Sequence, residues 1–238
     1  MGRIFVKGDC HRQFNFLEDF CKTFETTTDD ILILLGDVGI NYELNKNDIS
    51  IKRKLSQYPI TLFCVFGNHE CRPKHILSYK FSYIDRFKCN CWYESSYPNI
   101  FFPEDGAAEI NGLRFLIAGG AYSVDKDYRI ELGKKWFPDE QMSKEDKLRV
   151  RAVVKNNNKF DYVLSHTCPI NYIPHHLLLS FIDQSSVDKS MERYLQEIYE
   201  LLDKDYLKQY FFGHYHSDEI LPDKFHILYH DIVMIYSN

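Results

Sequence analysis

The chain has 238 residues, of which 45% are hydrophobic, and this length is sufficient to bury a sizeable core. Its formal net charge of −5 gives no support for a broad nucleic-acid-binding surface, and no run approaches the ~18 apolar residues of a membrane span. The seven cysteines are odd in number and irregularly spaced, and residues 1–6 run into a strand rather than a signal peptide. We therefore expect reduced thiols and a cytoplasmic protein.

Apolar runs alternate with amphipathic segments over the first seventy residues. Strands are predicted at residues 4–6, 31–35 and 60–66, and helices at 12–24 and 48–57. The run at 31–35 is apolar without alternation, which suits a strand covered on both faces. This order of elements is typical of an α/β fold.

The remainder of the chain adds shorter strands and two helices. Asn111-Gly112 predicts a tight hairpin turn, Ser143 is a natural N-cap, and residues 121–141 are expected to be irregular. Strands are predicted at 99–102, 107–110, 113–118, 161–165, 209–212, 225–229 and 232–236, and helices at 143–154 and 187–202. No linker divides the chain, so we expect one domain over residues 1–238.

Polar side chains follow five of the predicted strands, each just past the carboxyl end. These residues are Asp9, Asp37, Asn68, His166 and His214. In open α/β sheets, ligands bind at the carboxyl edge of the strands. The sequence therefore predicts a functional site there.

Carboxylate, imidazole and amide oxygen together suit divalent ions such as Mn²⁺, Fe²⁺ or Zn²⁺. Asp9 and His11 are two residues apart on a turn and can reach one ion. His214 and His216 have the same spacing and can face one ion or two. A carboxylate between two ions holds them ~3.5–4 Å apart, which suits the clamping of a phosphoryl group, and Asp37 is our candidate for it.

The order of these motifs resembles the calcineurin-like metallophosphoesterase family. The resemblance spans residues 8–216, with the segments in family order. The matching segments are Asp9-Cys10-His11, Gly36-Asp37, Gly67-Asn68-His69-Glu70, His166 and Gly213-His214-Tyr215-His216. The resemblance implies an α/β fold that is a four-layer α/β/β/α sandwich, with two mixed sheets flanked by helices.

The resemblance also implies a dinuclear centre of two divalent metal ions, such as Mn²⁺, Fe²⁺/Fe³⁺ or Zn²⁺, with a bridging hydroxide as nucleophile. His69 is then the general acid toward the leaving oxygen. The implied ligands are Asp9, His11 and His216 for the first ion, Asn68, His166 and His214 for the second, and Asp37 for both.

The chain departs from the phosphoprotein-phosphatase branch of that family. Ile40 stands where that branch places an acidic partner for the catalytic histidine, and Asn41 and Phe66 stand where it places arginines. This makes a close Ser/Thr protein phosphatase a poor match. Residues 119–141 instead resemble a group of uncharacterised bacterial and phage metallophosphoesterases.

Other basic residues are then needed to bind the phosphate oxygens. Lys126 and Arg129, within the stretch 119–129, and Arg72 are our candidates for substrate binding.

We expect hydrolysis of a phosphate-ester substrate, either a phosphomonoester or a small nucleotide-like molecule. One alternative is a phosphodiesterase or nuclease, because the same metal core serves both kinds of ester. A second alternative is an inactive metal-binding scaffold. The complete ligand set and the retained His69 argue against the scaffold.

Overall fold

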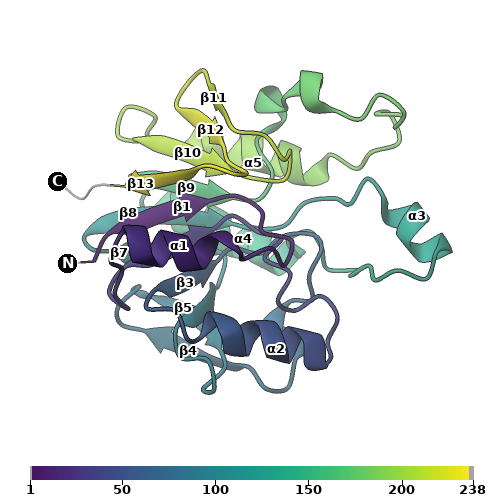
Figure 1. Cartoon of the computed structure of the whole chain (residues 1–238). Coiled ribbons are helices and arrows are strands. Elements are labelled where there is room, and N and C mark those ends of the chain that lie inside the picture. Colours follow the sequence, from purple (N-terminus) through teal and green to yellow (C-terminus); the bar gives the residue numbers. More distant parts are fainter. Residues whose placement is uncertain (1, 236–238) are drawn as a thin grey trace.

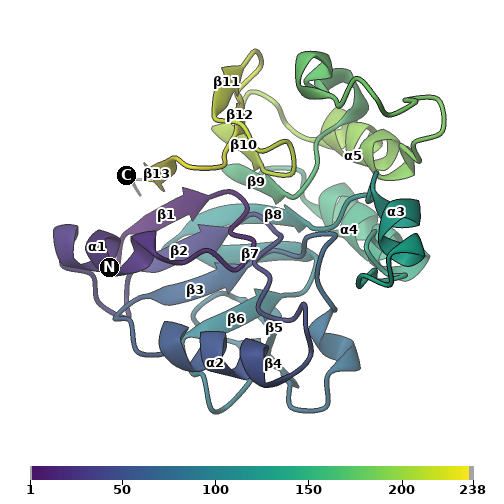
Figure 2. The same cartoon turned by 45° about the vertical axis from the view of Figure 1, so that its right-hand side comes forward.

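The structure is a computed structural model and describes residues 2–235. Two β-sheets lie face to face, as Figure 1 and Figure 2 show. Within the described residues, the first sheet has the order β13-β1-β2-β3-β6-β5-β4 and the second the order β11-β12-β10-β9-β8-β7. The neighbouring strands β1, β2, β3 and β6 run parallel, as do β8, β9, β10 and β12.

The strands of the first sheet are β1 (Ile4–Lys7), β2 (Ile31–Leu34), β3 (Thr61–Cys64), β4 (Lys80–Ile84), β5 (Cys89–Tyr93), β6 (Ile100–Pro103) and β13 (Ile232–Ile235). Those of the second are β7 (Gly106–Ile110), β8 (Leu113–Ala118), β9 (Tyr162–Ser165), β10 (Gln209–Phe212), β11 (Glu219–Leu221) and β12 (Phe225–Ile227). The helices are α1 (Phe16–Thr23), α2 (Lys46–Leu55), α3 (Lys126–Glu131), α4 (Lys144–Asn156) and α5 (Ser190–Leu201), and 3₁₀ turns lie at Pro73–His75, Ile170–Tyr172 and His175–Leu177.

Three hydrophobic clusters hold the layers together. The central cluster lies between the sheets and includes Ile33 of β2 and Leu164 of β9. One outer cluster packs α1 against the first sheet, for example through Leu17, and the other packs α4 and α5 against the second, for example through Val150 and Leu195. The predicted four-layer α/β/β/α sandwich is therefore confirmed.

The two local turn signals are confirmed. Asn111 and Gly112 have φ angles of 53° and 79°, the left-handed conformation that this hairpin turn needs. The Ser143 hydroxyl accepts the backbone N–H of Asp146 at 3.1 Å, and the Asp146 carboxylate accepts the N–H of Ser143, which forms a capping box.

Several predicted boundaries are wrong. The first helix begins at Phe16 rather than at residue 12, because His11 and Arg12 have φ angles of 44° and 70° and form a turn. The helix predicted at 187–202 begins at Ser190. Position 236, the predicted end of the last strand, lies outside the described residues.

Three strands and one helix were not predicted. β4 lies at the edge of the first sheet, and four of its five side chains are exposed, so it lacks an apolar pattern. It pairs with β5, which was also missed, and the three-residue β11 pairs with β12. The stretch 121–141, expected to be irregular, contains α3. Among residues 2–235, no helix combines the length and apolar character needed to cross a membrane.

Candidate metal centre

The structure brings the seven predicted ligand residues to one edge of the sandwich, on loops that follow parallel strands. Those that follow β1, β2 and β3 come from the first sheet, and those that follow β9 and β10 come from the second. The loops touch one another directly. The backbone N–H of His214 donates to Asp9 Oδ1 at 2.9 Å, and that of His69 donates to Asp37 Oδ1 at 2.8 Å.

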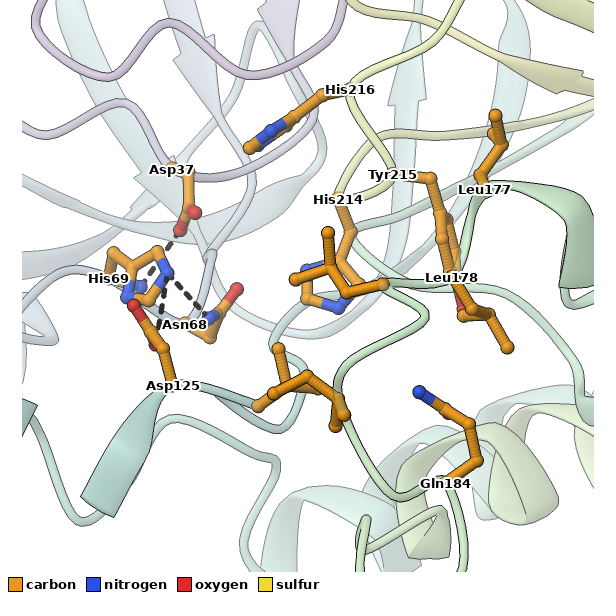
Figure 3. Close-up of a pocket in the computed structure, with 13 residues that line it drawn as sticks. Asp37, Asn68, His69, Asp125, Leu177, Leu178, Gln184, His214, Tyr215 and His216 are labelled. Carbon is orange, nitrogen blue, oxygen red and sulfur yellow. Dashed lines mark hydrogen bonds and ion pairs between the residues drawn. The ribbon is translucent and has the colours of Figure 1, made fainter. Parts of the chain in front are cut away.

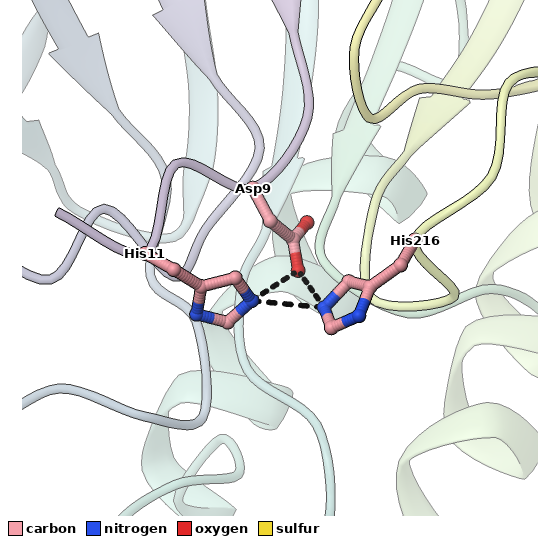
Figure 4. Close-up of side chains that lie close together, drawn as sticks. All are labelled: Asp9, His11 and His216. Carbon is pink, nitrogen blue, oxygen red and sulfur yellow. Dashed lines mark hydrogen bonds and ion pairs between the residues drawn. The ribbon is translucent and has the colours of Figure 1, made fainter. Parts of the chain in front are cut away.

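Asp9, His11 and His216 form the first cluster of ligand atoms (Figure 4). Asp9 Oδ2 lies 3.5 Å from His11 Nε2 and 3.2 Å from His216 Nε2, and the two imidazole nitrogens are 2.8 Å apart. Asp9 Oδ2 is buried and has no hydrogen-bond partner among the described residues. A buried carboxylate oxygen facing two imidazole nitrogens fits a divalent cation.

His166 and Asn68 belong to a second cluster. His166 Nδ1 lies 2.7 Å from the carbonyl oxygen of Leu35, which can only accept, so Nδ1 carries a proton. Asn68 Nδ2 donates to Ser123 Oγ at 2.9 Å, which turns Asn68 Oδ1 toward His166 Nε2 at 2.7 Å. Two acceptors at this distance repel each other unless a proton or a cation lies between them, so this pair also fits a metal ion.

Asp37 lies between the two clusters. Its Oδ1 is 3.6 Å from His166 Nε2, and its Oδ2 is 3.9 Å from His11 Nδ1, the ring nitrogen of His11 that does not face Asp9 and His216. Asp9, Asp37 and His166 also form a group of close ligand atoms by themselves. A carboxylate in this position is suited to binding one ion in each cluster, so that the two ions would share it.

Burial and the neighbouring groups together lower the pKa values of Asp9 and of His214, so both side chains lose their proton more readily. Burial alone raises the pKa of Asp9, but the neighbouring imidazoles of His166, His11 and His216 outweigh it, and the pKa lies well below its ordinary value. Burial, followed by the neighbouring imidazole of His166, lowers the pKa of His214 to about 3. An ionised carboxylate and a neutral imidazole are the forms that bind metals.

The backbone at these ligands is strained. The φ angles of His11, Asp37, His214 and His216 are 44°, 46°, 68° and 50°, a region that non-glycine residues seldom occupy. Such strain persists where the surrounding structure enforces it and is common at active sites.

Close packing of the loops enforces this conformation. A Cβ on Gly67 would lie 2.1 Å from both the backbone nitrogen and Oδ1 of Asp37, and a Cβ on Gly213 would lie 2.2 Å from Asp9 Oδ1. Glycine at these motif positions therefore allows the loops to reach one another.

Glu70, which was given no role from the sequence, connects these loops. Its buried carboxylate accepts the backbone N–H groups of Gly67 at 3.2 Å and Gly39 at 3.3 Å. Burial, reinforced by the charge of Asp37, raises the pKa of Glu70 to about 8. Its place in the Gly67–Glu70 motif was the signal that pointed to it.

His69, the predicted general acid, lies beside the ion pair that Asp125 and Arg129 form at α3. Its Nε2 is 4.0 Å from Asp125 Oδ1 and 3.4 Å from a terminal nitrogen of Arg129. Arg129 Nε donates to Asp125 Oδ2 at 2.7 Å, and its other terminal nitrogen donates to the Tyr42 hydroxyl at 3.2 Å. Burial, reinforced by the charge of Arg129 and opposed by that of Asp37, lowers the pKa of His69.

The three candidate substrate-binding residues are placed differently. Arg129 reaches the site through its contact with His69. Lys126 instead lies over the ring of Trp136, with its nitrogen 4.3 Å from the ring centre. Arg72 is buried; its Nε donates to the carbonyl of Asp139 at 2.8 Å, and a terminal nitrogen lies 3.4 Å from Asp105 Oδ2. Of these three residues, Arg129 is the one that contacts His69.

The fold and the cluster define an α/β sandwich with carboxylate, imidazole and amide groups suited to divalent ions, the class of the metal-dependent hydrolases. The model of the calcineurin-like phosphoesterase family matches residues 2–218, and the chain belongs to this family. The family is metal-dependent and hydrolyses phosphoesters, so the chain is a phosphoester hydrolase.

Solved structures resemble the chain only distantly. One crystal structure aligns over 98% of both chains, with 14% identity and a TM-score of 0.49. A protein of unknown function from Aquifex aeolicus aligns over 70% of this chain and 81% of its own, with 15% identity and a TM-score of 0.33. The phosphopantetheinyl hydrolase of Mycobacterium tuberculosis aligns over 96% of this chain and 88% of its own, with 14% identity and a TM-score of 0.39. No curated protein matches the chain.

Proposed function

We propose that this protein hydrolyses phosphate monoesters of small molecules at a centre of two divalent ions. The observation that carries the proposal is the convergence of two clusters of ligand atoms on either side of Asp37. The ligands would be Asp9, His11 and His216 for one ion, Asn68, His166 and His214 for the other, and Asp37 for both. Mn²⁺, Fe²⁺/Fe³⁺ and Zn²⁺ all suit this donor set.

Bound ions of this kind polarise phosphoryl oxygens and make water a nucleophile near neutral pH. In the reaction, a bond forms between a water oxygen and phosphorus, and the bond from phosphorus to the alcohol oxygen breaks. His69, when protonated, gives a proton to the departing alcohol oxygen, and its lowered pKa makes the protonated imidazole a stronger acid. Arg129, beside His69, is placed to attract the phosphate oxygens of the arriving substrate.

The surroundings of the cluster favour a small monoester over a nucleic-acid strand. The adjoining pocket is lined by Asp125, Gln184 and several aliphatic side chains, and no lysine or arginine is among the described residues that line it. Proteins that follow a nucleic-acid backbone use lysine and arginine contacts to its phosphates. The formal net charge of −5 agrees with this preference.

We also propose that residues 1–238 form a single domain in the cytoplasm. The central hydrophobic cluster joins strands from both halves of the chain, which supports one folding unit. All seven cysteines are buried free thiols, which suits a reducing compartment.

The test is to load the metal-free protein with Mn²⁺, Fe²⁺ or Zn²⁺ and to measure turnover of p-nitrophenyl phosphate beside bis-p-nitrophenyl phosphate. We expect two metal ions per chain and faster hydrolysis of the monoester. A strong preference for the diester would instead indicate a phosphodiesterase or nuclease. Metal binding without turnover of either ester would indicate an inactive scaffold.

A further inference from the structure

A pocket of about 250 Å³ opens directly beside the candidate metal centre. Its inner wall is formed by candidate ligands, among them Asp37, Asn68 and His214, together with His69. Figure 3 shows Asp37, Asn68 and His69 on one side and Leu177, Tyr215 and Gln184 on the other, with His214 between them. A phosphoryl group bound at the metal centre would therefore direct the rest of its substrate into this pocket.

The outer wall of the pocket is apolar. It is built mainly from the end of the 3₁₀ turn at His175–Leu177 and the segment that leads to α5. These contribute Leu177, Leu178, Leu179 and Ile182, and Val124 comes from a separate segment. Leu177 and Leu178 also pack against the hydrophobic cluster under α5, so this wall is anchored to the core.

Part of this apolar surface is left in contact with solvent. Leu179 is 48% exposed and Val124 is 38% exposed. An apolar group of a ligand would remove that surface from water, at a gain of ~25 cal/mol for each Å² buried.

Away from the candidate ligands, the polar groups of the pocket do not favour a charged alcohol part of the substrate. The hydroxyl of Tyr215 contacts Thr167 Oγ1 at 3.2 Å and Cys168 Sγ at 3.6 Å, so it is engaged by its own chain. Asp125 is paired with Arg129, and its negative charge disfavours a second anionic group nearby. Gln184 is uncharged and offers at most a hydrogen bond.

From this arrangement we propose that the substrate is a phosphate monoester of an apolar, uncharged alcohol, whose alkyl or aryl part lies against Val124, Leu179 and Ile182. The proposal rests on the function proposed above and narrows its substrate class, away from nucleotides and sugar phosphates. The products are inorganic phosphate and the free alcohol, which takes the proton from His69.

A series of n-alkyl phosphates tests this proposal, because ethyl, butyl and hexyl phosphate release alcohols of nearly equal acidity. Differences in kcat/KM then report binding of the chain rather than leaving-group chemistry. We expect kcat/KM to rise about fourfold for each methylene that reaches the apolar wall. A flat series, or a preference for glycerol phosphate or a nucleoside monophosphate over hexyl phosphate, would overturn the proposal.

The matched variants are Leu179→Ser, in the pocket, and Leu148→Ser, on α4 outside it. Both leucines are largely exposed, at 48% and 67%, so both variants should fold. We expect Leu179→Ser to lower the hexyl-to-ethyl ratio of kcat/KM by at least about threefold and Leu148→Ser to leave the ratio unchanged. Equal ratios in the two variants would refute the role of the wall.

Calorimetric titration with ethyl- and hexylphosphonate, which are not hydrolysed, separates this proposal from the proposed function. Tighter binding of the hexyl compound, with a more negative heat-capacity change, is expected even if no ester is turned over. That result without turnover would refute the proposed function alone. Turnover with equal phosphonate affinities would refute only the apolar substrate class.

Discussion

Replacement of Gly67 by alanine tests the packing that holds Asp37 in place. The new Cβ would lie 2.1 Å from the backbone nitrogen of Asp37, and this neighbour is backbone that cannot swing aside. Asp37 already has a φ angle of 46°, which leaves little conformational freedom to absorb the clash. The two loops must therefore separate by roughly 1 Å, and a displacement of that size at a catalytic site lowers turnover ~10²-fold.

The assay measures kcat/KM for p-nitrophenyl phosphate, bound metal per chain and the melting temperature. Gly112→Ala is the control, because its Cβ meets nothing within 4 Å, although its φ of 79° makes alanine unfavourable there. We expect this control to lose ~1–2 kcal/mol of stability and to keep its turnover. Wild-type turnover and metal content in Gly67→Ala would show that Asp37 is not held in place by this contact.

Three further predictions follow from the site and the fold. His69→Ala should lower kcat ~10²–10⁴-fold with metal content unchanged, whereas His75→Ala, at a histidine whose side chain is 54% exposed, should keep its turnover. Removal of metal with a chelator should abolish turnover and lower the melting temperature, and added Mn²⁺ should restore both. Hydrogen bonds from Arg3 and Thr27 outweigh burial and lower the pKa of Asp30 to about 2. Asp30→Asn should therefore cost about 1–2 kcal/mol at pH 7, since Arg3 is partly exposed. That difference should disappear as the pH falls from 3.8 to about 2, where the wild-type carboxylate becomes protonated.

For each of these three predictions, one result would contradict the reasoning. Loss of metal in His69→Ala would mean that His69 is a ligand rather than an acid. An unchanged melting temperature after chelation would mean that the clusters do not bind ions in the folded protein. A stability difference between wild type and Asp30→Asn that persists at pH 2 would show that the contribution is not that of an ionised carboxylate.

The buried parallel strands and the candidate ligands could be predicted because their signals are local. Unbroken apolar runs such as 31–35 identify strands covered on both faces, and each is followed by its own polar motif. Glycine and strained φ angles occur together at these strand ends, as at Gly36 and Asp37, with φ angles of 97° and 46°. The motif order therefore indicated both the sandwich and the place of the site.

The surroundings of His69 could not be predicted in this way. Asp125, at the start of α3, comes within 4.0 Å of His69, although the two residues are far apart in the sequence. Arg72, near in sequence, is instead buried against Asp105. Such contacts depend on tertiary packing between distant segments, which neither spacing nor residue type reveals. The edge strand β4 was missed for a related reason, because pairing with β5 rather than its own burial makes it a strand.

The two sheets contribute separate residues to the candidate metal centre, and this division has a mechanical consequence. His11 and His216, which face each other at 2.8 Å, are 205 residues apart in the sequence. An ion held between them joins the beginning and the end of the chain in the manner of a cross-link, and a closed loop of this length restricts the unfolded chain strongly. Metal-bound protein would therefore resist the separation of its two sheets. The supply of metal would then determine the lifetime of the folded protein as well as its catalytic activity.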